Sequence, residues 1–228
     1  MRVEPYTIDS YLHVIKRGAR GMNIVREESD YWRFLRMIFL LNDKHFDRYW
    51  RDGNLNDIFS RPVHLPPREP IVEVVAYTLL PNHFHLVLHE VLEGGTTLFM
   101  KRLGQSMTNH SNEKYGEKGS LFQGSYRSKT INEDQYLRYA AIYVMVKNTF
   151  ELYPEGGLLS AQHNFDEAWR WAEQYNFSSL GDYSGARDNS PILNKGLLGE
   201  IFTPETFKVF SRDVILGGKW KAGTETFE

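Results

Sequence analysis

The stretch IVEVVAYTLLPNHFHLVLHE, residues 71–90, contains two runs rich in apolar and β-branched residues, separated only by Pro81 and Asn82. Such residues favour strands, and proline followed by asparagine favours a tight turn or a bulge. The stretch therefore predicts a strand, a turn and a second strand. Alternate residues of a strand point to the same face, so His83 and His85 are expected to lie side by side.

The segments around this hairpin predict a regular alternation of strands and helices. Strand formers dominate 10–16 and 121–131, and apolar residues at helical spacing occur over 28–41, 96–107 and 133–148. The resulting order, β-α-β-β-α-β-α, predicts an α+β fold of the ferredoxin-like kind, with an antiparallel sheet and helices packed on one face.

The composition changes at two places along the chain. Residues 42–70 are rich in charge, asparagine, glycine and proline, which predicts a loop insertion. Beyond Phe150 a turn-rich segment is followed by helix-like stretches, and no internal repeat is present. We therefore expect residues 1–150 to form the principal domain, and residues 151–228 to form a mostly helical accessory region folded onto it.

The overall composition excludes several kinds of chemistry. None of the 228 residues is a cysteine, so a metal ion must be held by nitrogen and oxygen atoms. The longest apolar run, 34–41, is too short to span a bilayer and the start lacks a signal-peptide core, which predicts a cytoplasmic protein. The net charge of −2 includes a segment, 101–130, with six basic and two acidic residues, which suits either a polyanionic partner or an ordinary solvated surface.

His83 and His85 have the spacing of a metal clamp. Cα atoms two residues apart on a strand are separated by roughly 6 to 7 Å. Metal–nitrogen bonds of about 2.0 to 2.2 Å therefore leave both imidazoles within reach of one ion. A His-x-His pair is also common by chance, so a structural role for both histidines stays open.

A row of tyrosines lies on the helix expected at 133–148, and Tyr139 and Tyr143 share one helical face. A tyrosine can act as a nucleophile when a neighbouring metal ion polarises the electrophile. A tyrosine stripe on an amphipathic helix also serves core packing. The residues alone leave both interpretations open.

Taken together, these segments resemble a known family. PNHFHLVL, 81–88, is similar to the histidine–hydrophobe–histidine motif of single-tyrosine HUH transposases, in the form with Pro-Asn before the first histidine that occurs in REP-associated tyrosine transposases. Further similar segments follow the family's order along the chain: YLHVIKRGARG at 11–21, a helix, loop and strand at 98–128, YLRYAAIYVMVKN at 136–148, and NFSSLGDYSG at 176–185. The resemblance covers nearly the whole chain.

The resemblance implies that residues 1–150 form a catalytic domain that cuts and rejoins single-stranded DNA, at or near hairpins or repeats. It implies that Tyr143 attacks the scissile phosphate and forms a 5′-phosphotyrosine intermediate. It also implies that His83 and His85 hold one divalent cation, Mg²⁺ or Mn²⁺, which polarises that phosphate. Tyr139, one turn earlier, is the alternative nucleophile.

One position departs from the family pattern. The family's third metal ligand is an amide four residues after the tyrosine, whereas Lys147 occupies that position here and Asn148 follows it. A protonated lysine cannot ligate a cation. We expect the helix to widen and bring Asn148 round as the third ligand; otherwise Lys147 contacts phosphate and another group completes the metal site.

The implied partner is single-stranded or hairpin DNA, and the sequence leaves open whether the chain acts alone or as a homodimer. Two alternatives remain: a descendant that binds structured nucleic acid without cutting it, and a metallophosphoesterase that uses water while Tyr143 only packs. Basic residues near the motifs are the expected DNA contacts. They are Arg17 and Arg20 at a hairpin stem, and Arg102, Arg127, Lys129 and Lys147 at phosphates.

Overall fold

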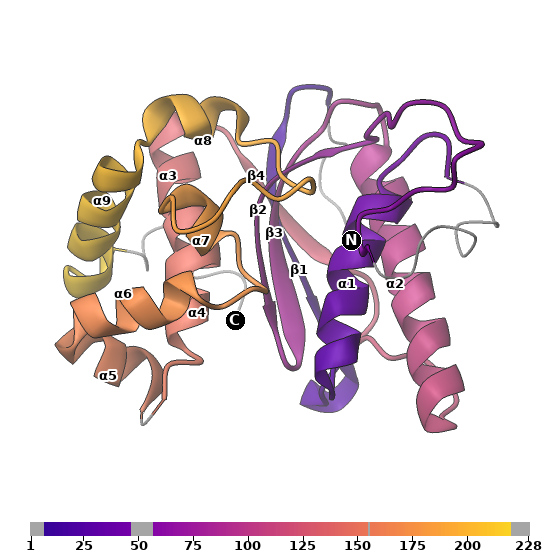
Figure 1. Cartoon of the computed structure of the whole chain (residues 1–228), viewed down its shortest axis with the longest axis horizontal. Coiled ribbons are helices and arrows are strands. Elements are labelled where there is room, and N and C mark those ends of the chain that lie inside the picture. Colours follow the sequence, from indigo (N-terminus) through magenta and orange to yellow (C-terminus); the bar gives the residue numbers. More distant parts are fainter. Residues whose placement is uncertain (1–6, 47–56, 155, 220–228) are drawn as a thin grey trace.

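A four-stranded sheet forms the centre of the protein (Figure 1). The computed structural model describes residues 7–46, 57–154 and 156–219. The sheet order is β2-β3-β1-β4 with every pair antiparallel, and α1 and α2 connect β1 to β2 and β3 to β4. The predicted α+β fold class with an antiparallel sheet is therefore confirmed. The expectation that the helices pack on one face is wrong, because the helices that follow β4 cover the second face. The bounds are β1 Tyr11–Arg17, α1 Glu28–Leu41, β2 Glu73–Leu80, β3 His83–His89, α2 Gly95–Tyr115 and β4 Arg127–Ile131.

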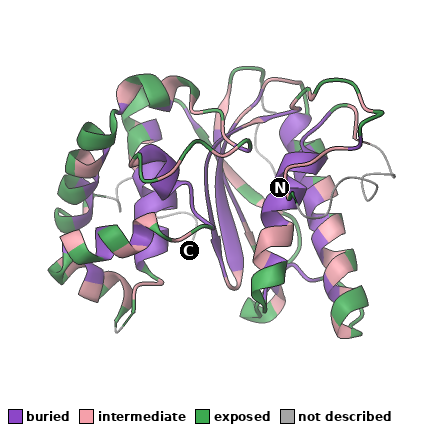
Figure 2. Ribbon diagram, viewed as in Figure 1, coloured by how far each residue is buried: buried purple, intermediate pink, exposed green. Residues whose placement is uncertain are grey.

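Both faces of the sheet are covered, and the side chains of β3 alternate between two hydrophobic clusters. Phe84, Leu86 and Leu88 pack with residues of α1 and α2, whereas Val87 belongs to a cluster formed with the helices that follow β4. The central strands are buried on both sides (Figure 2). This explains why 71–90 consists of continuous apolar runs: a sheet covered on both faces needs apolar residues at successive positions.

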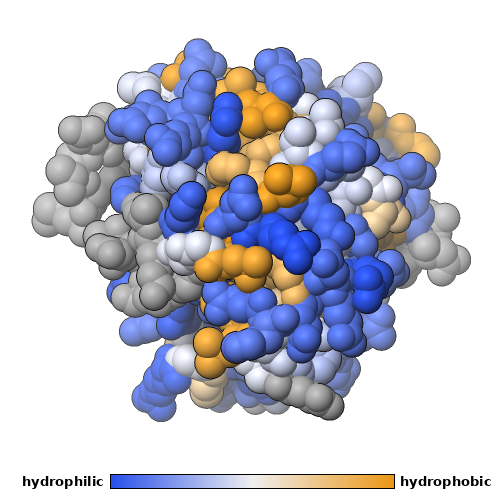
Figure 3. Space-filling view, turned by 90° about the vertical axis from the view of Figure 1, so that its left-hand side faces the viewer, coloured by the Kyte–Doolittle hydropathy of each residue, from blue (hydrophilic) through white to orange (hydrophobic). Residues whose placement is uncertain are grey.

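Helices that follow β4 form the layer on the second face. Their surface, seen from the left of Figure 1, is largely hydrophilic with apolar side chains in separate patches (Figure 3). The helices beyond residue 150 share one hydrophobic cluster with α3, so they shield the sheet together. The bounds are α3 Asp134–Ile142, a π-helical turn Tyr143–Lys147, α4 Asn148–Phe150, α5 Gly157–His163, α6 Phe165–Glu173, α7 Leu180–Tyr183, α8 Gly196–Ile201 and α9 Pro204–Leu216.

The expected loop insertion at 42–70 is only partly described. Residues 42–46 and 57–70 contain neither helix nor strand, and residues 47–56 lie outside the described residues. Within the described ranges, none of the helices has the length and apolar character needed to cross a membrane.

The segment between α6 and α7 closes the outer edge of β2. The backbone N–H of Leu79 donates to the carbonyl of Phe177 over 2.9 Å, and the hydroxyls of Thr78 and Ser178 lie 2.8 Å apart. The Ser178 hydroxyl also donates to the carbonyl of Met145, in the π-turn, over 3.3 Å. The segment therefore protects an edge strand and ties the π-turn to the sheet.

Asp30, in the first turn of α1, joins α1 to α2 from a nearly fully buried position. Its carboxylate accepts hydrogen bonds from Lys114 at 2.8 Å and Tyr115 at 2.5 Å, both at the end of α2, and from the backbone N–H groups of Arg26 and Glu27. Burial alone would raise the pKa of this carboxyl, but the four hydrogen bonds outweigh burial and hold its pKa well below the usual range.

We expect Asp30→Ala to lower the free energy of unfolding by about 3 kcal/mol at pH 7, because the Tyr115 hydroxyl and two backbone N–H groups lose their buried acceptor and Lys114 loses its buried partner. A carboxyl whose pKa is depressed in the folded state contributes stability above its unfolded pKa, about 3.9, and loses that contribution as the pH falls further. Urea denaturation at pH 7, 5 and 3 should therefore show that the difference in free energy of unfolding between wild type and variant narrows only below about pH 4. A difference that stays constant down to pH 3 would contradict this explanation.

Candidate active site

The strand register brings three histidines together on the face of the sheet that α3 covers. Arg17 of β1 lies opposite His83 and Ile15 lies opposite His85, and directly opposed residues of antiparallel strands share a face. His13 has the same parity on β1, and its Nε2 lies 2.9 Å from Nδ1 of His85. The ring centroids of His83 and His85 are 5.0 Å apart. The predicted pair therefore lies together, joined by His13, which the sequence analysis missed.

Tyr143 packs edge-on against this histidine cluster. Its ring centroid lies 5.5 Å from that of His85 and 5.6 Å from that of His13, and the side chain is only 2% exposed. Tyr139, one turn earlier, instead stacks on Phe210 of α9 at 5.8 Å. Of these two tyrosines, the structure brings Tyr143 to the histidines.

The helix widens immediately after Tyr143. Residues 143–147 form a π-helical turn, in which the backbone N–H of Asn148 bonds to the carbonyl of Tyr143 five residues earlier. A turn of this kind accommodates one additional residue and is frequent at functional sites. The side chain of Asn148 is fully buried, and neither its amide oxygen nor its amide nitrogen has a hydrogen-bond partner among the described residues. The widening expected from the sequence is therefore present.

Lys147 lies inside the site rather than on the surface. Its Nζ is 3.4 Å from the phenol oxygen of Tyr143 and 4.6 Å from the centroid of that ring. The same Nζ forms an ion pair with Glu151 at 2.6 Å. The structure therefore places Lys147 at the hydroxyl of the candidate nucleophile.

Burial favours the neutral form of His13 and His85, the form in which an imidazole binds a metal ion. Burial lowers the pKa of His13 to about 3, with a further contribution from Lys129, and burial together with nearby cationic groups holds the pKa of His85 well below its usual value. Nδ1 of His83 lies 2.6 Å from Oδ1 of Asn82 and donates to it. Nδ1 of His85 is engaged with Nε2 of His13, so Nε2 is the candidate ligand atom of His85.

The available donors fit a divalent cation only if an amide takes part. Within the described ranges, no group of three histidine, aspartate or glutamate side chains is arranged to hold a metal ion. The amide of Asn148 is buried and has no hydrogen-bond partner among the described residues, so it is the candidate for the missing oxygen donor. Two imidazole nitrogens with an amide oxygen and water suit Mn²⁺, and Mg²⁺ accepts the oxygen donors readily.

The predicted DNA-contact residues fall into three groups: four on or next to β1 and β4, Arg102 on α2, and Lys147 in the π-turn. Arg17 and Arg20 are exposed where β1 ends beside His83. Arg127 and Lys129 lie on β4 opposite Ile15 and His13, so they share the face of the histidines. Arg102 lies on α2, on the other face, where it donates to the carbonyls of Leu41 and Asp43 at the end of α1. Lys147 forms the third group, within the site.

Arg17→Ala and Arg102→Ala are expected to separate a DNA contact from a structural arginine. Arg17→Ala should weaken DNA binding several-fold, with the unfolding midpoint unchanged. It should also reduce, by about one, the magnitude of the slope of the logarithm of the binding constant against the logarithm of the salt concentration. Arg102→Ala should leave the slope unchanged and lower stability by about 1 to 2 kcal/mol, because the α1 carbonyls lose their donor. Fluorescence anisotropy at several salt concentrations and urea denaturation measure both. The reverse pattern would show that we have assigned the two roles wrongly.

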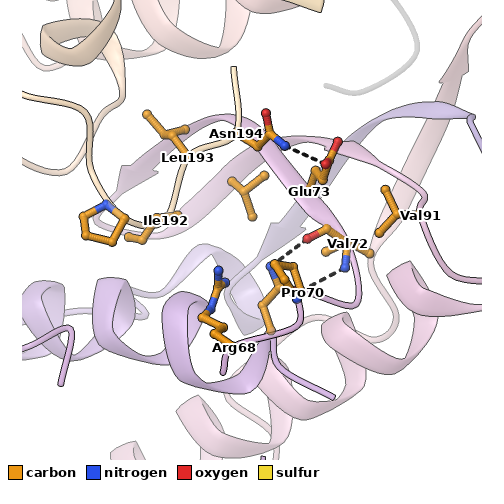
Figure 4. A pocket seen from close by; sticks show the side chains of 11 residues that line it. Arg68, Pro70, Val72, Glu73, Val91, Ile192, Leu193 and Asn194 are labelled. Carbon is orange, nitrogen blue, oxygen red and sulfur yellow. Dashed lines mark hydrogen bonds between the residues drawn. The ribbon is translucent and has the colours of Figure 1, made fainter. Parts of the chain in front are cut away.

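A small pocket of about 140 Å³ lies at the opposite end of the β2–β3 hairpin (Figure 4). Its wall includes Arg68, Val72 and Ile192, and at its rim Asn194 donates to Glu73 over 2.5 Å. Glu73 pairs with His89, about 20 Å of strand from His83, and neither the three clustered histidines nor Tyr143 line the pocket. The pocket is therefore not part of the candidate active site.

Comparison with solved structures gives a distant likeness, and the sequence comparisons give none. No family model and no curated protein sequence matches the chain. Among solved structures, the chain is similar to a REP-associated tyrosine transposase bound to a REP hairpin, with 15% sequence identity, a TM-score of 0.43, and coverage of 86% of this chain and 90% of that one. A likeness at this level assigns no activity, so the function is inferred below from the residues themselves.

Proposed function

We propose that the protein is a metal-dependent, single-tyrosine HUH-type DNA nickase and strand-transfer enzyme, transposase-like in its chemistry. The proposal is supported above all by the convergence of His85 and Tyr143, which are far apart in sequence and have ring centroids 5.5 Å apart. A pair of neutral imidazoles beside a phenol provides a metal clamp and a nucleophile at one point. A water-using phosphoesterase would instead favour a carboxylate-rich metal site, which the described residues lack.

In the proposed reaction, the phenol oxygen of Tyr143 attacks a DNA phosphate in line with the 3′ oxygen. The bond between the phenol oxygen and phosphorus forms as the bond between phosphorus and the 3′ oxygen breaks. The phenol proton passes to water, and the 3′ oxygen takes a proton from water. One strand then ends in a free 3′-hydroxyl and the other in a 5′-phosphotyrosine. Attack by a 3′-hydroxyl reverses the step, and no ATP is needed because one phosphodiester replaces another.

His83, His85 and the amide oxygen of Asn148 are the proposed metal ligands. A bound Mg²⁺ or Mn²⁺ would supply Lewis-acid polarisation of a non-bridging phosphate oxygen. Asn82 and His13 each engage Nδ1 of one proposed ligand imidazole and fix the orientation of its ring, which would direct Nε2 toward the ion. These supporting contacts are usually as important to metal affinity as the ligands themselves.

The proposed partner is single-stranded DNA that contains a hairpin. The exposed guanidinium groups of Arg17, Arg20 and Arg127 lie around the histidine face and would neutralise backbone phosphates there. We place the reaction in the cytoplasm, as the sequence predicts, and the assembly could be a monomer or a homodimer.

The burial of Tyr143 favours a second candidate function, that of a structured nucleic-acid-binding protein that no longer cuts. A phenol that is 2% exposed and held by Lys147 must be uncovered before it can reach a phosphate. The basic residues at the rim would serve binding equally well without cleavage.

A denaturing gel separates the two functions. Purified protein would be incubated with a labelled library of single-stranded hairpins and Mn²⁺, with EDTA as the control. Strand transfer predicts a labelled adduct that resists denaturation and disappears with EDTA. DNA binding by anisotropy without an adduct from any hairpin would instead establish the non-cutting protein.

A further inference from the structure

Lys147 is a buried ammonium group that the proposed chemistry does not yet use. The residue is 3% exposed, and its Nζ contacts the phenol oxygen of Tyr143 and the carboxylate of Glu151. An ammonium group is costly to bury, and an apolar side chain of the same length would fill this space without that cost. A lysine at this position therefore calls for a role that involves its charge.

The π-turn separates the tasks of Lys147 and Asn148. Because the N–H of Asn148 bonds to the carbonyl of Tyr143, the fourth and fifth residues after Tyr143 both lie one turn above it. The fourth residue, Lys147, contacts the phenol oxygen at 3.4 Å. The fifth, Asn148, offers an unpartnered amide instead. A lysine has no lone pair to give to a metal ion while protonated, so only Asn148 can act as a ligand.

We propose that Lys147 is a positioning residue for the nucleophile, with Glu151 as its anchor. The ammonium donates a hydrogen bond to the Tyr143 oxygen and so fixes where that oxygen lies. It also compensates the negative charge that this oxygen gains as its proton leaves for water, before the bond to phosphorus is complete. An interaction of this kind is stronger in the transition state than in the ground state, so it accelerates the step. The inference depends on the proposed function.

A charge role predicts opposite effects of Lys147→Met on chemistry and on stability. The rate of adduct formation should fall about 100-fold, as when one preorganised donor to a developing oxyanion is removed. The unfolding midpoint should stay the same or rise, because methionine fills the space and Glu151 is partly exposed to water. Affinity for DNA should change less than about threefold, since a buried ammonium adds little to binding by surface phosphate contacts.

Two further variants sharpen the test. Glu151→Gln removes the anchor but keeps Lys147, so the rate should fall by a smaller factor, about 3 to 10. Lys208→Met is the matched control, because Lys208 is an exposed lysine of α9 that pairs with Asp166. It should leave the rate of adduct formation unchanged.

The experiment measures single-turnover adduct formation with saturating hairpin DNA and Mn²⁺, DNA affinity by anisotropy, and urea denaturation for all four proteins. A slow, stable, DNA-binding Lys147→Met supports the inference. A variant as fast as wild type overturns it while leaving the proposed function intact. A rate that falls only in proportion to lost folding or lost DNA affinity also overturns it, in favour of a structural or DNA-contact role. No adduct with wild type would overturn both proposals.

Discussion

Tyr143→Phe should abolish the covalent protein–DNA adduct and reduce strand cleavage by at least about 10³-fold. The change removes only the phenol oxygen, which is the proposed attacking atom. The ring that packs against His13 and His85 is retained, so folding and DNA affinity should stay close to wild type. The measurement is a denaturing gel of adduct and cleaved strand, with anisotropy for binding.

Tyr139→Phe is the matched control for this prediction. It makes the same change one turn earlier on the same helix, where the ring stacks on Phe210 and not on the histidines. Adduct formation should therefore persist. Loss of the adduct only in Tyr139→Phe would move the nucleophile to that residue. Cleavage without any adduct, equal in wild type and Tyr143→Phe, would indicate that water attacks the phosphate.

His83→Ala and His85→Ala should each reduce cleavage by at least about 10²-fold and spare most DNA binding. Cleavage depends on one ion that both imidazoles hold, whereas binding depends on many phosphate contacts. Raising the Mn²⁺ concentration should recover part of the activity, because one lost ligand weakens metal affinity without removing the nucleophile. The adduct yield, measured as a function of Mn²⁺ concentration, tests this effect.

His89→Ala provides the matched histidine control. His89 lies on the same strand and has the same parity, but it stacks on Tyr11 and pairs with Glu73 away from Tyr143. Its removal should leave the Mn²⁺ requirement unchanged. Equal losses of cleavage and DNA affinity in His83→Ala or His85→Ala would indicate that these histidines support folding rather than metal binding.

The hairpin at 71–90 shows how much of the fold the sequence specifies. Its two apolar runs and the Pro81–Asn82 turn became β2 and β3, with β3 beginning at His83. The two strands and the turn could be predicted because strand propensity, turn residues and apolar pattern are local signals that agree with one another. The continuous apolar pattern is explained by the second layer of helices after β4, which the sequence analysis, with its helices on one face, did not predict.

The residues that the sequence analysis missed or misplaced depend on long-range geometry. His13 meets His85 only because β1 and β3 pair in one particular register, and nothing in SYLHVIK specifies that register. Arg102 belongs to the basic segment 101–130, yet α2 turns it toward the end of α1 and away from the histidines. Charge along the chain therefore indicated a basic region but could not show which face each residue occupies.

The departure at Lys147 from the pattern of the family that the sequence resembles was the most informative feature of the sequence. It predicted either a widened helix or a different third ligand, and the π-turn at Tyr143–Lys147 is the widened form. What the sequence could not show is that Lys147 itself lies at the phenol oxygen. That contact depends on side-chain packing within the turn.

The central claim is that Tyr143 becomes covalently linked to the 5′ end of cleaved DNA. The most direct test is to form the adduct with wild-type protein and Mn²⁺, trim the DNA with nuclease, digest with protease, and sequence the modified peptide by mass spectrometry. The account predicts a nucleotide mass on Tyr143, joined through the 5′ phosphate. A nucleotide on any other residue, or an unmodified Tyr143 in a reaction that has cleaved DNA, would contradict it.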